Sequence, residues 1–152
     1  MTEAALYIKG EVRFRIKPSQ YLAPPQNFCV TPDVETLWTR YEGYLRGREP
    51  LLPMAYFCLT VIEAAYNGRA NAAKHLNVAE AFLDRIGKLA STKGDSLTAR
   101  KIDVLSTKRS LSGLETTWLQ EALPALIRRL GEAHSPIPSK RLDMKDFPPL
   151  DP

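Results

Sequence analysis

The chain has 152 residues, which is enough for one ordinary hydrophobic core and excludes two comfortable domains. Apolar residues make up 44% of the chain and charged residues 25%, so the composition is that of a globular protein and excludes wholesale disorder. The formal net charge of +4 is concentrated in residues 88–109, which contain six lysines and arginines but only two aspartates. Such a region can attract phosphates or acidic partners, or it can be an ordinary solvated surface.

The cysteines and the N-terminus indicate the compartment. Cys29 and Cys58 provide no disulfide framework, and Cys58 lies in an apolar run where we expect a buried free thiol. The first residues lack the basic and apolar regions of a signal peptide, and the longest apolar run, 51–62, is too short to span a bilayer. We therefore expect a cytoplasmic protein that does not enter a membrane.

Residues 6–16 alternate between apolar and polar side chains, which is typical of a half-buried strand. Gly10 interrupts the pattern, either as a bulge or, together with Lys9, as a hairpin turn. Few partner strands follow, so pairing with a second copy would cover the open edge, and we expect a homodimer. The predicted fold class is α-rich α+β: an N-terminal β-strand or hairpin followed by a bundle of about five helices.

Capping residues mark the first helix, and hydrophobicity marks the second. Thr31 followed by Pro32 predicts a helix that begins at 32 and ends before Gly47. The next helix, 50–66, is apolar nearly all round, so we expect it at the centre of the core. Its charged residue, Glu63, must reach solvent or find a basic partner. Arg69 and Arg100 are the candidates.

The second half of the chain predicts further helices and an irregular tail. A helix is expected at 97–105, and Ser112 with Glu115 matches a capping box that begins the last helix, to about 133. The prolines from 135 onward exclude regular structure, although Phe147 suggests that this tail docks on a surface, its own or a partner's. We therefore expect one helical domain with its N-terminal strand at 1–134 and a Pro-rich C-terminal tail at 135–152.

Residues 69–90 predict a short helix, a tight turn and a second helix. Ala73 is small enough to let two helices cross, and Asn77 tolerates the left-handed backbone that such a turn requires. Apolar residues stand wherever the two helices must touch, including Leu83 and Ile86. On these residues the segment resembles the helix-turn-helix superfamily of DNA-binding proteins.

The resemblance implies that helix 79–89 lies in the major groove of duplex DNA. Its outward residues would then include Glu80, which could accept a hydrogen bond from cytosine, and two cations that could contact guanine or phosphate. Further cations would bind the DNA backbone beside the groove. The expected nucleic-acid-binding residues are Arg85, Lys88, Lys93, Arg100 and Lys101.

Two alternatives use other residues. Arg69 and His75, with five residues between them, resemble the arginine and histidine of the helical HEPN ribonucleases. That resemblance implies metal-independent RNA cleavage in which Arg69 binds the scissile phosphate and His75 transfers the proton. The other alternative is a protein–protein adaptor that acts through the N-terminal strand and the Pro-rich tail.

The sequence lacks a metal-ligand cluster, a glycine-rich phosphate loop and a nucleophile elbow, so we expect no metal and no cofactor. Our main interpretation is a small, non-catalytic, intracellular nucleic-acid-binding protein, with duplex DNA as the favoured partner.

Overall fold

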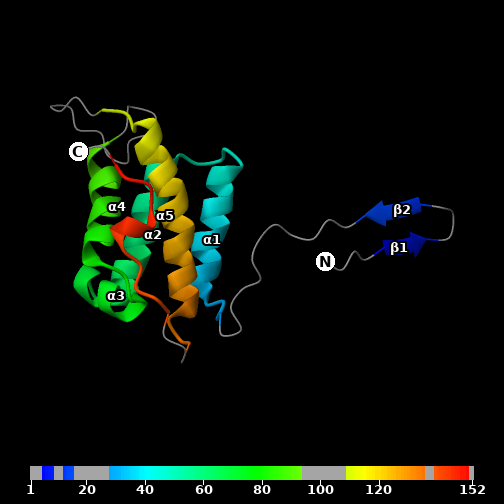
Figure 1. Ribbon diagram of the computed structural model, residues 1–152, viewed down its shortest axis with the longest axis horizontal. Helices are drawn as coiled ribbons and strands as arrows, with labels where there is room; N and C mark the ends of the chain where they lie inside the picture. The colour runs from blue at the N-terminus through cyan, green and yellow to red at the C-terminus, as the bar shows by residue number, and fades with distance from the viewer. Residues whose placement is uncertain (1–4, 9–11, 16–27, 94–108, 136–138, 151–152) are drawn as a thin grey trace.

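A computed structural model describes residues 5–8, 12–15, 28–93, 109–135 and 139–150. Five helices form the folded domain, and a short 3-10 helix, η1, lies near the C-terminus (Figure 1). The helices are α1 (Pro32–Leu45), α2 (Leu51–Ala65), α3 (Arg69–Leu76), α4 (Glu80–Thr92) and α5 (Gly113–Glu132), and η1 is Met144–Asp146.

The predicted α-rich α+β class is wrong, because helices alone build the core. Every residue of the core cluster lies between Val34 and Leu130, in one of the five helices or in the turn between α3 and α4. Two short N-terminal strands, β1 (Ala5–Ile8) and β2 (Val12–Arg15), pair with each other in an antiparallel two-stranded sheet. The core needs no sheet because α2 is apolar on all sides and is covered by other helices.

Helix α2 is the central element of the domain, as its composition predicted. Seven of its residues are buried, and it contacts α1, α3, α4 and α5. Cys58 in its middle is a free cysteine with no exposed surface, and burial raises the pKa of its thiol to about 12. The thiol is therefore a core group rather than a reactive one, since the thiolate is the reactive form.

Two of the predicted helix starts are confirmed by their capping hydrogen bonds. Thr31 Oγ1 accepts from the backbone N–H of Val34 at 3.3 Å, and Pro32 occupies the first helical turn of α1. Ser112 Oγ accepts from the N–H of Glu115 at 3.1 Å, while the Glu115 carboxylate accepts from the N–H of Ser112 at 2.8 Å. This reciprocal pair is the predicted capping box of α5. The helix expected at 97–105 lies outside the described residues.

Helices α1 and α5 are antiparallel neighbours. The Tyr41 hydroxyl donates to the carbonyl of Gln120 at 3.0 Å, and the N–H of Cys29 donates to the carbonyl of Gly131 at 2.9 Å. Phe28 lies directly on Gly131, where the absence of a side chain makes room for its ring. In the described part of the chain, no helix combines the length and hydrophobicity needed to cross a membrane.

Residues 139–150, which we call the C-terminal strap, run back along the bundle beside α4 and α5 (Figure 1, orange to red). The ring of Phe147 stacks on Phe82 of α4 with 5.0 Å between ring centroids, and it lies 5.7 Å from Trp118 of α5. Leu142, Met144 and Leu150 also pack against the core. The tail therefore docks on its own domain.

The contact between Phe28 and Gly131 gives a test of the packing of α1 on α5. A Cβ added to Gly131 would lie 2.1 Å from the Phe28 ring, so we expect Gly131→Ala to lower the free energy of unfolding by about 1–3 kcal/mol. Gly113→Ala is the matched control, because its Cβ would meet nothing within 4 Å and alanine favours a helix. Urea unfolding followed by circular dichroism measures both. Equal effects of the two substitutions would contradict the described contact.

Candidate nucleic-acid interface

The segment from α3 to α4 has the predicted local geometry. Asn77 ends α3 in the left-handed conformation, with φ 51° and ψ 51°. Ala73 is buried at the helix contact, and Leu83 and Ile86 anchor α4 from beneath with no exposed surface. These features agree with the pattern that resembles a helix-turn-helix. Membership of that superfamily stays a prediction.

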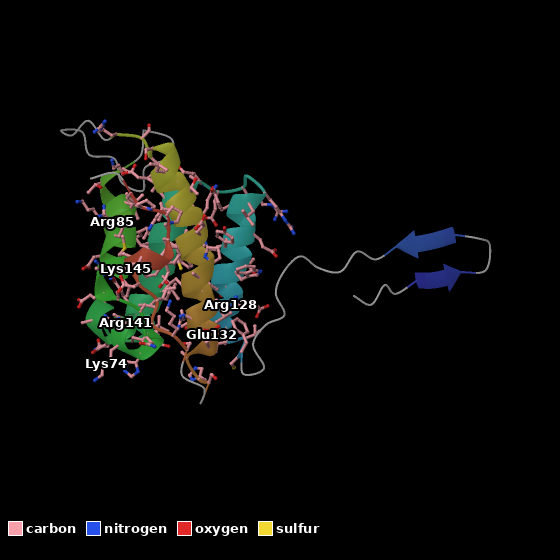
Figure 2. All side chains as sticks on the ribbon, in the orientation of Figure 1. Lys74, Arg85, Arg128, Glu132, Arg141 and Lys145 are labelled. Atoms are coloured by element: carbon pink, nitrogen blue, oxygen red, sulfur yellow. The ribbon has the colours of Figure 1, made fainter. Side chains whose placement is uncertain are left out.

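The outward side of α4 is accessible. Glu80, Asp84 and Lys88 are exposed, and Arg85, which Figure 2 labels on α4, is half-buried. Arg85 and Lys88 make no ion pair within the described residues. The two predicted contact residues of α4 are therefore available to an external anion.

A charged network joins α2, α3 and α4. Arg69 Nε lies 2.6 Å from the Glu63 carboxylate, and its Nη1 lies 2.8 Å from the Asp84 carboxylate. The guanidinium rests on Gly87, where an added Cβ would meet it at 3.0 Å. Burial acts to lower the pKa of Arg69, but the two carboxylates outweigh this and raise it. The network confirms Arg69 as the partner expected for Glu63, and because one guanidinium faces two carboxylates it keeps a net negative charge.

The ribonuclease alternative requires Arg69 and His75 to share one site, and the same network separates them. Arg69 is held by two carboxylates, whereas His75 stacks on Tyr66 with 5.4 Å between the ring centroids. Residues six positions apart on a helix point about 120° away from each other. Arg69 and His75 therefore do not converge on one phosphate, and the geometry does not favour this alternative.

Lys93 was predicted to bind a nucleic-acid backbone, but the structure places it in an ion pair. Its ammonium lies 3.1 Å from the Glu115 carboxylate at the start of α5. Burial acts to raise the pKa of Glu115, yet the N–H of Ser112 and the Lys93 ammonium together hold it below its usual value. Lys93 thus fixes the end of α4 to α5. Arg100 and Lys101 lie outside the described residues.

A small hollow lies between α3 and α5. Its volume is about 280 Å³, and His75, Asn77, Arg129 and Glu132 are among its lining residues. The Arg129 guanidinium is already occupied, because it donates to the Ser139 hydroxyl and to the carbonyl of Lys140 and faces Glu132. The hollow therefore lies where α5 contacts the strap. Among the described residues, no group of three His, Cys, Asp or Glu side chains is placed to bind a metal.

Seven cations of the described residues have carboxylate partners: Arg40 with Glu49, Arg46 with Glu42, Arg69 with Glu63 and Asp84, Lys93 with Glu115, Arg128 and Arg129 with Glu132, and Lys140 with Asp146. Seven others make no ion pair within residues 28–93, 109–135 and 139–150, and five of these belong to α3, α4 and the strap. We call these five the basic row; its members are Lys74, Arg85, Lys88, Arg141 and Lys145. The other two unpaired cations are Arg48, in the α1–α2 turn, and Arg109, before α5.

The basic row extends over three segments of the chain. Figure 2 shows Arg85 on α4, Lys145 and Arg141 on the strap and Lys74 at the end of α3, in succession along the bundle. The sequence interpretation missed Lys74, Arg141 and Lys145. No sequence signal identifies the strap cations, because their place beside α4 depends on the docking of Phe147 against Phe82, residues far apart in the chain.

Comparison with known proteins adds no family to this description: no protein-family model, no curated protein and no solved structure matches the chain. The homodimer stays a prediction, because a single chain does not test it. The adaptor alternative is not favoured, since Phe147 and Leu150 of the tail pack against the chain's own core.

The Lys93–Glu115 pair predicts a specific pH dependence. The pKa of Glu115 lies below its ordinary 4.5 in the folded protein, so its charge stabilises the fold above that pH and ceases to do so as the pH falls through the lowered value. Glu115→Gln should therefore be less stable than wild type at neutral pH, and the difference should shrink by about pH 3.

Urea midpoints at the two pH values measure this difference. Lys93→Gln is the partner control, because it removes the same ion pair and should show the same narrowing in acid. A stability difference that is equal at both pH values would contradict the assignment of the charge interaction.

Proposed function

We propose that the chain is a small cytoplasmic, non-catalytic protein that binds nucleic acid through the basic row, with duplex DNA as its ligand. The observation that supports this proposal is the location of the unpaired cations. Five of the seven cations that make no ion pair within the described parts of residues 28–150 belong to α3, α4 and the strap: Lys74, Arg85, Lys88, Arg141 and Lys145. Unpaired cations on neighbouring segments of a small domain attract a polyanion, and their binding is favoured further by the counterions that a nucleic acid releases.

The acidic residues of α4 reduce this attraction but do not abolish it. Arg69 pairs with Asp84 and also with Glu63, so its single charge leaves one of these two negative charges uncompensated, and Glu80 adds another on the exposed side of α4. Arg85 stands near the middle of the helix and Lys88 in its second half, and the last turn carries no basic residue. The charge that α4 presents to solvent therefore changes sign along its length, from acidic at the start to basic toward the end.

The proposal predicts that replacing both α4 cations weakens binding. Arg85→Ala combined with Lys88→Ala should raise the Kd for a labelled duplex by roughly 10- to 30-fold at about 50 mM salt, since each charge-assisted contact contributes about 1 kcal/mol. Fluorescence anisotropy measures the affinity. Circular dichroism should show an unchanged fold, because both side chains lie outside the core.

Arg48→Ala is the matched control for this experiment. Arg48 is also exposed and makes no ion pair with a described residue, but it lies in the turn between α1 and α2. It should leave the Kd within about twofold of wild type. Failure of the wild-type protein to bind a duplex in low salt would overturn the proposed function, as would equal losses in the control and the double variant.

A further inference from the structure

We infer that the basic row binds the phosphodiester backbone of a duplex from outside and does not read its base sequence. The inference rests on the proposed function and deepens it. Three features support it: the strap on the α3–α4 turn, the position of the charges along α4, and the direction in which Arg85 points.

The strap is hydrogen-bonded to the α3–α4 turn. In a helix-turn-helix protein, the helix that follows this turn enters the major groove of DNA. The N–H of Leu142 donates to the carbonyl of Asn77 at 3.1 Å, and the carbonyl of Leu142 accepts from the N–H of Ala79 at 2.8 Å. The side-chain amide of Asn77 also donates to the carbonyl of Ser139 at 2.7 Å. The strap is therefore fixed beside the start of α4 by three hydrogen bonds.

The size of the major groove decides the consequence of this pairing. An α-helix with its side chains is about 10–12 Å wide and the groove is about 12 Å wide, so a single helix fills it. A paired backbone segment adds about 5 Å beside the first turn of α4. Helix and strap together exceed the groove, and the N-terminal end of α4, the part that contacts bases in helix-turn-helix proteins, is excluded from it.

The charges of α4 agree with this exclusion. The exposed side chains of its first turn are Glu80 and Ala81, neither of which attracts a phosphate. The cations, Arg85 and Lys88, come one and two turns later. A DNA backbone can therefore approach the second half of α4, while the first turn offers it a negative charge.

Arg85 is the cation of α4 that points toward the strap side of the helix. Phe82 marks this side, because it contacts Phe147 of the strap. Arg85 lies about 60° around the helix from Phe82, whereas Lys88 lies about 120° and Asp84 about 160° from Phe82 in the same direction, so Lys88 is about 40° from Asp84. Lys145 is two residues before Phe147 on the strap itself. Arg85 and the strap cation Lys145 thus belong to one side of the domain, and Lys88 lies between this side and Asp84.

The row is long enough to meet several phosphates. The 13 residues of α4 span about 20 Å, and a duplex carries one charge per about 1.7 Å of its axis. Five cations that each neutralise one phosphate predict a slope of about −4.5 for the logarithm of the binding constant against the logarithm of the salt concentration.

The experiment uses the full chain and three labelled duplexes of equal length, about 20 base pairs, with unrelated sequences. Affinities measured by anisotropy at several salt concentrations should agree within about twofold among the duplexes, with a slope of about −4.5. Lys145→Ala and Arg141→Ala should each make the slope shallower by about one on all three duplexes, while Arg48→Ala leaves it unchanged.

Other results would contradict either the inference or the proposed function. A tenfold or greater difference in affinity in favour of one duplex would contradict the inference but not the proposed function, because one mismatched base pair costs a sequence-specific protein about 1–3 kcal/mol. Unchanged salt slopes in both strap variants would also contradict the inference. No binding to any duplex in low salt would instead overturn the proposed function.

Discussion

The aromatic cluster of Phe82, Trp118 and Phe147 is the contact on which both the domain and its candidate interface depend. It joins α4, α5 and the strap, and its three ring pairs lie 5.0–5.7 Å apart. The Trp118 Nε1 is buried there without a hydrogen-bond partner among the described residues, which costs about 1–3 kcal/mol. Three aromatic pairs at about 0.5–1.5 kcal/mol each, in addition to the apolar area that they bury, are sufficient to offset this penalty.

Fixing the strap in this way determines which charges the domain presents. Phe147 and the paired Leu142 hold the strap at both ends, so Arg141 and Lys145 stay beside α4. On the other flank of α4, Arg69 pairs with both Glu63 and Asp84 and rests on Gly87, where an added Cβ would meet the guanidinium at a tight 3.0 Å. That flank therefore keeps a net negative charge, whereas Arg85 and the strap cations add positive charge on the strap side.

The sequence predicted the features that depend on neighbouring residues. A capping box connects residues three apart, so Ser112 and Glu115 identified the start of α5, and the left-handed turn at Asn77 depends on the conformational tolerance of one residue. The composition of α2 likewise predicted its central place, because an apolar helix has to be covered on every side.

The features that the sequence did not predict arise from contacts between distant segments. The ion pair of Lys93, which was expected to bind a nucleic-acid backbone, was not predicted, because its partner Glu115 lies 22 positions later in the sequence. The α+β class was inferred from the alternating pattern of one segment, but such a pattern does not reveal whether a sheet enters the core. The strap cations were missed for the same reason, since only the fold shows that the tail returns to α4.

Local helix-turn-helix geometry does not by itself determine how a protein meets DNA. Ala73 and Asn77 satisfy requirements that two crossed helices and their turn impose on each other, whatever lies outside them. Entry into the major groove additionally requires that no other chain segment cover the start of the second helix. In this chain the backbone of Leu142 is hydrogen-bonded beside the start of α4. The turn that resembles that of a helix-turn-helix therefore anchors the strap. Under the proposed function, a polyanion would therefore meet the flank formed jointly by α4 and the strap, through charge rather than through base recognition.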